Sequence, residues 1–211
     1  MIIKTITLGG LETNCYLVLN EDSGDCLIVD PAAEPERVIA ALKTLNRNGG
    51  GPKVIGIVNT HGHADHIGAN TRIKKEFSCP VYVHRLDAPL LVSPAQNLSA
   101  SLYFEEIKSP AADVLVEEGD VLPNNLKVIH TPGHTPGSIC LVGDSFVLSG
   151  DTLFCGSVGR WDLLGGDERT LMQSLKKLTK LPAHFIFYPG HGPSCTIGNE
   201  LKHNPFLAGI I

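Results

Sequence analysis

The chain has 211 residues; 43% of them are hydrophobic, 18% are charged, and the formal net charge is −5 at pH 7. A chain of this length and composition can bury a large core and fold as a soluble globular protein without stabilising disulfides. The acidic balance, the lack of a basic run and the lack of an uncharged apolar stretch of about 18 residues exclude nucleic acid and a membrane from the expected partners.

The first half of the chain predicts short strands that alternate with helices. Strands are expected over residues 2–8, 15–19, 26–29, 54–58 and 80–83. Turn residues between the second and third of these strands predict a hairpin. Helices are expected over 34–47, with four apolar residues on one face, and over 67–77. Residues 89–110 contain several prolines and serines, so we expect an irregular segment that flanks a cleft.

The second half repeats this organisation. Strands are expected over residues 114–116, 126–129, 138–142, 146–148 and 185–188, and helices over 167–179 and 196–203. No linker separates the halves, so we expect one domain over residues 1–211. The simplest packing places two sheets face to face with helices outside, which is an α/β protein built as a four-layer αββα sandwich.

The N-terminus and the cysteines indicate a reducing compartment. The first residues have strand character and lack the charged and then apolar pattern of a secretion signal, which favours a cytoplasmic protein. The six cysteines form no CxxC pair, so we predict reduced, mostly buried thiols, with Cys155 as a packing residue. They are Cys15, Cys26, Cys79, Cys140, Cys155 and Cys195.

The most informative segment is residues 60–66, Thr-His-Gly-His-Ala-Asp-His, directly after the predicted strand 54–58. Imidazole nitrogens and a carboxylate are the ligands that divalent ions such as zinc and iron accept. Because the motif follows a strand, we expect Asp65 and His66 to open a helix. The end of a strand is a rigid support for metal ligands.

Three later segments each combine a predicted strand with a glycine-rich loop that holds one ligand-type residue. These residues are His134 in Pro-Gly-His-Thr-Pro-Gly, Asp151 in Ser-Gly-Asp-Thr, and His191 in Pro-Gly-His-Gly-Pro. Glycine lets the backbone approach a buried ion closely. A single loop of this kind is weak support for a metal site, but three in this order after the histidine motif are strong support.

Together these motifs resemble the metallo-β-lactamase superfamily, and within it the glyoxalase II-like hydrolases. The resemblance runs from Asp30-Pro31 to the C-terminus, whose His203-Asn204-Pro205 is similar to that of short bacterial members. It implies the metallo-β-lactamase fold and two divalent ions. Zinc is the expected ion, with iron or manganese as alternatives.

When the metal ligands of the family are carried over to the matching positions of this chain, the resemblance implies seven ligands. One ion would be held by three histidines, a second by an aspartate and two histidines, and one aspartate would bridge both. In that order the ligands are His61, His63 and His134; Asp65, His66 and His191; and Asp151. Asp65 and Asp151 are also the residues assigned to catalysis. His66 occupies a position at which metallo-β-lactamases proper lack a histidine, which argues against antibiotic hydrolysis.

The resemblance implies hydrolysis of a small-molecule thioester, plausibly an acylglutathione such as S-lactoylglutathione, by a hydroxide that bridges the two ions. A thiolate leaves without an acid, which suits a site whose identifiable residues are metal ligands. Arg160 could bind a substrate carboxylate, or it could pair with Asp162. Trp161 could line the cleft or pack. Full-length relatives have a C-terminal helical domain that supplies much of the glutathione pocket, so weak discrimination among thiols is expected.

Other readings remain open. A mononuclear-iron persulfide dioxygenase shares the His-x-His-Ala-Asp-His motif and a Gly-Arg-x-Asp loop, but usually has a different third loop. A lactone hydrolase could use the same site, and a non-catalytic metal-binding module is the third class. The sequence is silent on the oligomeric state. The remaining histidines are expected to be structural or solvated, with His203 packing near the site; these are His84, His130, His184 and His203.

Overall fold

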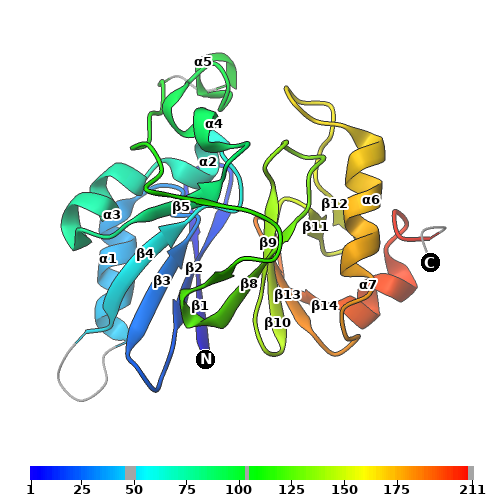
Figure 1. The fold of residues 1–211 in the computed structure, drawn as a ribbon, viewed down its shortest axis with the longest axis horizontal. Helices are drawn as coiled ribbons and strands as arrows, with labels where there is room; N and C mark the ends of the chain where they lie inside the picture. The colour runs from blue at the N-terminus through cyan, green and yellow to red at the C-terminus, as the bar shows by residue number, and fades with distance from the viewer. Residues whose placement is uncertain (46–50, 103–104, 209–211) are drawn as a thin grey trace.

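The computed structural model describes residues 1–45, 51–102 and 105–208. Two six-stranded sheets lie face to face, and helices cover their outer faces (Figure 1). The first sheet has the order β1 to β6, with β3, β4, β5 and β6 parallel to one another. Its strands are β1 (Ile2–Leu8), β2 (Thr13–Leu19), β3 (Asp25–Val29), β4 (Lys53–Val58), β5 (Val81–His84) and β6 (Val114–Val116).

The second sheet belongs to the second half of the chain and is mostly antiparallel, with one parallel pair, β10 and β13. Its spatial order is β14 (Cys195–Thr196), β13 (Ile186–Pro189), β10 (Phe146–Gly150), β9 (Ile139–Val142), β8 (Leu126–His130) and β7 (Val121–Leu122). A 3₁₀ turn, η1 (Pro123–Asn125), joins β7 to β8. A separate small hairpin consists of β11 (Leu153–Phe154) and β12 (Ser157–Val158).

Helices α1 and α3 cover the outer face of the first sheet, and α6 and α7 cover that of the second (Figure 1). The short helices α2, α4 and α5 lie toward the edge at which the parallel strands of the first sheet end. The helices are α1 (Pro35–Thr44), α2 (Ala64–Ile67), α3 (Asn70–Phe77), α4 (Ala88–Val92), α5 (Ser99–Leu102), α6 (Glu168–Leu178) and α7 (Ile197–His203). Within the described ranges, none of these helices is long and apolar enough to span a bilayer.

Three hydrophobic clusters fill the three spaces between the four layers. Strand β2 shows why, because it is buried on both faces and its side chains alternate between two of them. Cys15, Leu17 and Leu19 pack toward α1 and α3, whereas Tyr16 and Val18 pack toward the second sheet. The third cluster lies under α6 and α7. The predicted αββα sandwich is therefore confirmed. That the whole chain is one domain stays a prediction, although both halves contribute to the middle cluster.

The predicted strands are all present, but some other expectations were wrong. The helix expected over 67–77 is divided into α2 and α3. At the division Gly68 lies against the chain at Ala32, where a Cβ would stand 2.3 Å from the carbonyl oxygen, and Ala69 N donates to Pro31 O. The supposedly irregular segment 89–110 contains α5 and most of α4. The helix expected over 34–47 ends at Thr44, and residues 46–47 lie outside the described ranges.

Candidate metal centre

The histidine motif spans the loop after β4 and the first residues of α2, where Asp65 and His66 open the helix as predicted, and its histidines are buried. The exposed fractions of His61, His63 and His66 are 1%, 4% and 0%. Asp30, which follows β3, fixes the start of this loop: its carboxylate accepts hydrogen bonds from Thr60 N at 2.8 Å and Thr60 Oγ1 at 2.6 Å. Neighbouring parallel strands thus bring Asp30 and the motif to the same edge of the first sheet.

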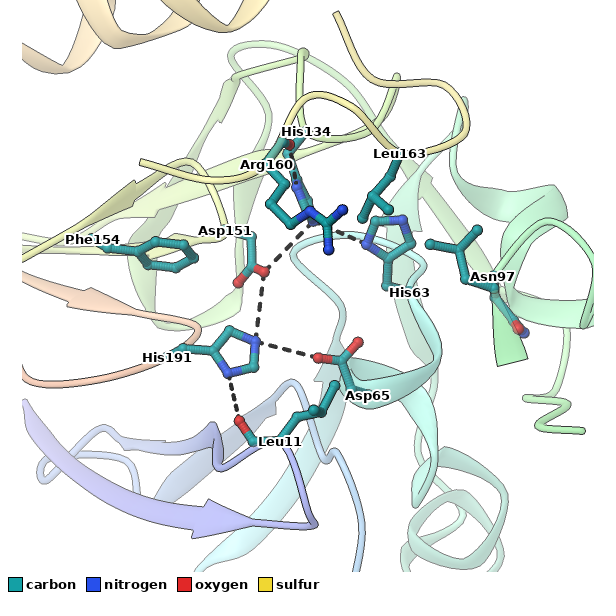
Figure 2. A pocket seen from close by; sticks show the side chains of 11 residues that line it. Leu11, His63, Asp65, Asn97, His134, Asp151, Phe154, Arg160, Leu163 and His191 are labelled. Carbon is teal, nitrogen blue, oxygen red and sulfur yellow. Dashed lines mark hydrogen bonds and ion pairs between the residues drawn. The ribbon is translucent and has the colours of Figure 1, made fainter. Parts of the chain in front are cut away.

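The second half delivers the three other predicted ligands to the same place. His134 follows β8, Asp151 follows β10, and His191 follows β13. Asp151 Oδ2 lies 3.6 Å from His134 Nε2 and 3.5 Å from His191 Nε2, and its Oδ1 lies 3.4 Å from His66 Nε2. Figure 2 shows His191 between Asp151 and Asp65, whose Oδ2 lies 3.3 Å from His191 Nε2. All seven predicted ligands are therefore neighbours.

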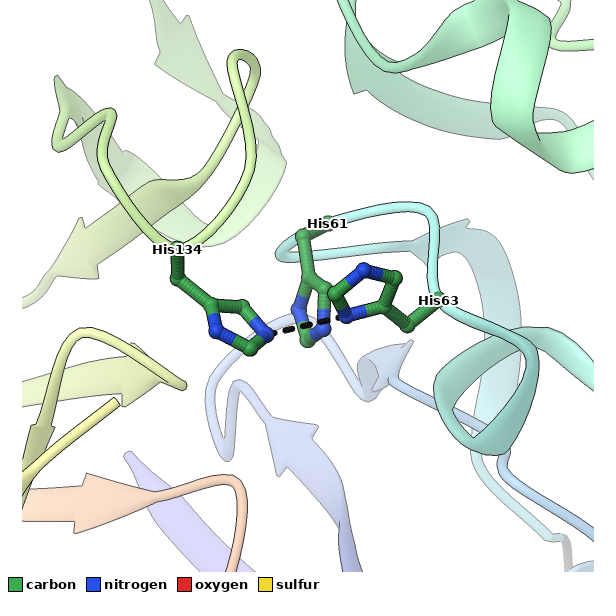
Figure 3. A group of neighbouring side chains, drawn as sticks. All are labelled: His61, His63 and His134. Carbon is green, nitrogen blue, oxygen red and sulfur yellow. Dashed lines mark hydrogen bonds between the residues drawn. The ribbon is translucent and has the colours of Figure 1, made fainter. Parts of the chain in front are cut away.

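Three overlapping groups of these residues present one ligand atom each within 4.8 Å of one another. The groups are His61, His63 and His134; His61, His66 and Asp151; and Asp65, His66 and His191. Figure 3 shows the first group, with His134 approaching from the second half of the chain. The first and third groups coincide with the two triads implied by the sequence. The role of each residue as a ligand stays a prediction.

The free polar atoms of the site fit a bound cation. Among the described residues, His61 Nε2, His66 Nε2 and Asp151 Oδ1 are buried without a hydrogen-bond partner. Such unsatisfied atoms are rare in folded proteins and require an explanation. Imidazole and carboxylate are a suitable donor set for zinc, iron or manganese, and one or two ions would satisfy these atoms together.

The other nitrogen of several rings is held from behind, which orients the nitrogen that faces the centre. Nδ1 of His66 lies 3.0 Å from Asp30 Oδ2, and Nδ1 of His134 lies 2.8 Å from Arg160 O. Nδ1 of His191 lies 2.9 Å from Leu11 O. In each case the oxygen accepts the Nδ1 proton, which leaves Nε2 as the ring atom that faces the centre.

Two histidines of the first triad are kept neutral. Burial, together with the neighbouring imidazoles, lowers the pKa of His61 well below its ordinary value and that of His63 to about 3. A neutral imidazole offers a lone pair at physiological pH. Both residues are thus available to a metal without prior loss of a proton.

His66 experiences the opposite field. Burial alone would lower its pKa, but the carboxylates of Asp65, Asp151 and Asp30 raise it to about 10. Three carboxylates around one buried ring strongly favour positive charge at this point. A divalent cation would satisfy that preference better than a single proton.

Glycine is required at two close approaches in this centre. A Cβ on Gly190 would lie 2.0 Å from Asp151 Oδ1, and one on Gly159 would lie 1.7 Å from Asp151 O. Gly190, in the third of the predicted glycine-rich loops, and Gly159, outside these loops, therefore let the backbone approach a predicted ligand closely.

A cavity of about 250 Å³ opens onto the centre (Figure 2). It is lined by the predicted ligands His63, Asp65, His134, Asp151 and His191, and by Leu11, Asn97, Leu98, Phe154, Arg160 and Leu163. The walls beyond the ligands are thus mainly apolar, with Asn97 and Arg160 as the polar exceptions. This size and lining suit a small organic substrate.

Arg160 lines the cavity but also pairs with Asp162. Its Nε and Nη2 donate to Oδ1 and Oδ2 of Asp162, both at 2.9 Å, and both side chains are exposed. Trp161 contacts Phe206, with ring centroids 6.2 Å apart, and packs against the cluster beneath α6. In the structure, therefore, Arg160 forms the ion pair with Asp162 that was one of its two predicted roles, and Trp161 packs rather than lining the cavity.

The remaining histidines do not join any ligand group within the described ranges. His84 and His130 stack on each other between the two sheets, with ring centroids 4.0 Å apart. His184 and His203 are exposed. Cys155 is exposed too, so its expected role as a packing residue was wrong.

Two buried aspartates escaped the sequence analysis. Asp30 could have been found by the rule that polar residues at the ends of parallel strands gather at one edge. Asp87 does not directly follow a predicted strand or belong to a motif, so nothing in the sequence pointed to it. It is fully buried and accepts hydrogen bonds from Gly62 N at 2.8 Å, Gly137 N at 2.6 Å and Thr135 Oγ1 at 2.7 Å. It thereby joins the loop of the first histidine triad in one half to that in the other.

The chain is similar to known proteins over most of its length. The family described as the metallo-beta-lactamase superfamily matches residues 8–191. A protein of Aquifex aeolicus is 42% identical over 217 residues, covering 100% of this chain and 99% of its own length. The probable metallo-hydrolase YqgX of Bacillus subtilis is 36% identical and the hydroxyacylglutathione hydrolase GloC of Haemophilus influenzae 33% identical; in both cases 98% of each chain is covered.

Solved structures match over almost the whole chain as well. BLEG-1, described as a B3 metallo-beta-lactamase, has a TM-score of 0.92 at 39% identity, covering 99% of this chain and 100% of its own. TTHA1623 in a di-iron-bound form has a TM-score of 0.85 at 40% identity, covering 97% and 100%. ETHE1 from Myxococcus xanthus has a TM-score of 0.80 at 28% identity, covering 99% and 85%.

Proposed function

The chain belongs to the metallo-β-lactamase superfamily of metal-dependent hydrolases, and from this premise we propose that it hydrolyses a small thioester, of the acylglutathione type, with two divalent ions. The observation that carries the proposal is the convergence of seven potential ligands at one place, where five of them line an open cavity. We propose zinc as the native ion. The di-iron form of TTHA1623, 40% identical, keeps iron as the alternative for this chain.

The residues have distinct tasks in this proposal. His61, His63 and His134 would hold one ion, Asp65, His66 and His191 the other, and Asp151 would contact both. Bound ions would supply a water of lowered pKa and polarise the substrate carbonyl. Asp30 and the carbonyl oxygens behind His134 and His191 keep the rings oriented.

A thioester is favoured because of what the cavity wall lacks. Among the described residues that line it, the polar ones apart from the five predicted ligands are Asn97 and Arg160. Neither is a general acid at neutral pH, since an amide does not titrate and a guanidinium does not release its proton. A thiolate leaving group, whose thiol has a pKa of about 8.5, needs no such acid.

The identity of the thiol is proposed from a relative and from one residue. GloC of Haemophilus influenzae, a hydroxyacylglutathione hydrolase by name, is similar over the full chain. Arg160 lines the cavity and could exchange Asp162 for a carboxylate of the substrate, because exposed ion pairs contribute little free energy. We expect weak discrimination among thiol carriers, since this single exposed contact would recognise the carrier.

Two other functions are favoured by specific similarities. The similarity to BLEG-1 makes hydrolysis of a β-lactam a candidate, in spite of the sequence-based argument from His66. The persulfide dioxygenase alternative, which would use a single iron, rests on the His-x-His-Ala-Asp-His motif and the Gly-Arg-x-Asp loop of this chain. The three functions differ in substrate and in metal stoichiometry.

One set of measurements separates these candidates. The full chain is purified without added metal, its metal content is determined, and it is assayed with S-lactoylglutathione, a thioester without the glutathione peptide, a chromogenic cephalosporin, and glutathione persulfide with an oxygen electrode. We expect two ions per chain and kcat/KM values for the two thioesters within about 10-fold of each other. A single iron with oxygen uptake, or turnover of the cephalosporin alone, would refute the proposal. A preference for the glutathione ester above ~10³-fold, about 4 kcal/mol, would refute the weak discrimination.

A further inference from the structure

A second cluster of ligand-type side chains lies beside the cavity, outside the predicted metal centre. It consists of Cys155 in the turn between β11 and β12, Cys195 in β14, and Glu200 in α7. The two sulfurs and a carboxylate oxygen of Glu200 lie within 4.8 Å of one another. The segments that carry the two thiols also form part of the cavity wall, because Phe154 precedes one thiol and His191 stands four residues before the other.

The surroundings hold both thiols in place. Glu200 is 1% exposed, and its Oε2 accepts hydrogen bonds from Gly156 N and Asn204 Nδ2, both at 2.8 Å. The first of these bonds ties the turn that contains Cys155 to α7. Asn199 Nδ2 donates to Cys195 Sγ at 3.0 Å. Hydrogen bonds thus hold both segments in position while the two sulfurs lie within 4.8 Å of each other.

These two cysteines differ from the other four in accessibility. Cys155 is exposed and Cys195 partly exposed, whereas the other four are at most 4% exposed. Burial raises the pKa of those four thiols, which makes them inert. Burial, with Glu200 and Cys155 nearby, raises the pKa of Cys195 to about 11. Cys155 is therefore the thiol that a reagent meets first, and Cys195 is placed to react second.

We propose that Cys155 and Cys195 are a redox-active pair that closes into a disulfide when the oxidant is a low-molecular-weight disulfide, RSSR. The Cys155 thiolate attacks one sulfur of RSSR, an S–S bond forms, and RS⁻ leaves. Cys195 then attacks Cys155 Sγ and expels the second RS⁻, while its proton passes by way of the Glu200 carboxylate to the departing thiolate. The balance is two protein thiols plus RSSR giving one protein disulfide and two RSH.

The disulfide would act on the cavity through its wall. The Phe154 ring faces the His191 ring, with centroids 6.0 Å apart. A bond between the two segments that carry these rings fixes them relative to each other. Oxidation should therefore raise the thermal stability of the whole protein, by about 4 °C or more, and change the KM of substrates that contact Phe154. The pair does not depend on which reaction the metal centre performs.

The test treats the full-length protein with oxidised glutathione and follows its intact mass, free thiols and Tm. The wild type should lose two hydrogens and two reactive thiols, release two glutathione molecules, and melt at a higher temperature; dithiothreitol should reverse all of this. Cys195→Ser should retain one glutathionyl group on Cys155, and Cys155→Ser should remain unmodified. The matched control Cys79→Ser, which removes a buried thiol elsewhere, should behave as the wild type.

Three results would overturn the proposal. One is a wild type that keeps both reactive thiols after exposure to oxidised glutathione. Another is a wild type that accumulates a stable mixed disulfide instead of losing two hydrogens. The last is protection of the two thiols by a bound ion, removed by a chelator, which would make the cluster a metal site.

Discussion

Replacing Asp87 by alanine should loosen the ion held by the three-histidine group while leaving the protein folded. The Asp87 carboxylate is the only group described between the loop before α2 and the loop after β8 that accepts hydrogen bonds from both, through Gly62 N, Gly137 N and Thr135 Oγ1. These loops carry His61 and His63 on one side and His134 on the other. The substitution therefore removes the support of the metal centre without touching a predicted ligand.

The magnitude follows from the stranded donors. Each buried donor left without a partner costs about 1–3 kcal/mol, so three cost about 3–9 kcal/mol. In the wild type, burial raises the pKa of Asp87 despite the bonds from Thr135, Gly62 and Gly137, which shows that burying this carboxylate is unfavourable. The substitution removes that unfavourable burial. We expect the two contributions to leave a net loss of about 3 kcal/mol, or a fall in Tm of roughly 6–12 °C for a chain of this size.

Metal affinity should fall roughly 10–100-fold at the three-histidine group, as is usual when the support of a ligand is removed. Asp87→Asn should recover part of the loss, because its amide oxygen can accept the two bonds that Oδ2 accepts, from Gly62 N and Thr135 Oγ1, while its NH₂ group would face Gly137 N, another donor. The assay is urea unfolding of the metal-free protein together with competitive zinc titration. The control is Asp144→Ala, since Asp144 is exposed in the turn between β9 and β10. Unchanged zinc affinity and a stability loss below about 1 kcal/mol would refute this reasoning.

Asp151→Ala should lower metal content at both sites and abolish activity, whereas His191→Ala should mainly empty one site; elemental analysis with retention of two ions by the first variant would contradict the bridging role. Arg160→Ala should raise KM for S-lactoylglutathione by roughly 10-fold with little change in kcat, because it would remove uniform binding; an unchanged KM would leave that side chain to Asp162 alone. Burial and its neighbours lower the pKa of His84 to about 4, so the unfolded chain binds a proton that the folded chain rejects between about pH 6.5 and pH 4. Stability should fall by about 1–3 kcal/mol as the pH drops through this window, and His84→Phe should show a smaller fall in urea unfolding; equal slopes would contradict the assignment.

The sequence determined the architecture and identified the seven candidate ligands that the structure brings together. Apolar strands of period 2 and helices of period 3.6 are local patterns, so the two halves and their αββα arrangement follow from short windows of residues. The histidine motif and the three glycine-rich loops each follow a strand. Since strand ends gather at one edge of a sheet, their meeting could be predicted before any coordinate was known.

Only the tertiary structure decided which distant side chains outside these strand-end motifs meet. Asp87 reaches Thr135 across 48 positions, and Cys155 reaches Cys195 across 40, through contacts that depend on how the sheets pack rather than on neighbouring residues. No local pattern distinguishes Asp87 from a solvated aspartate. The periodicity of strands and helices can be detected in the sequence because backbone geometry repeats every few residues. Side-chain contacts across the fold have no such repeat, so they become visible once the two halves are packed together.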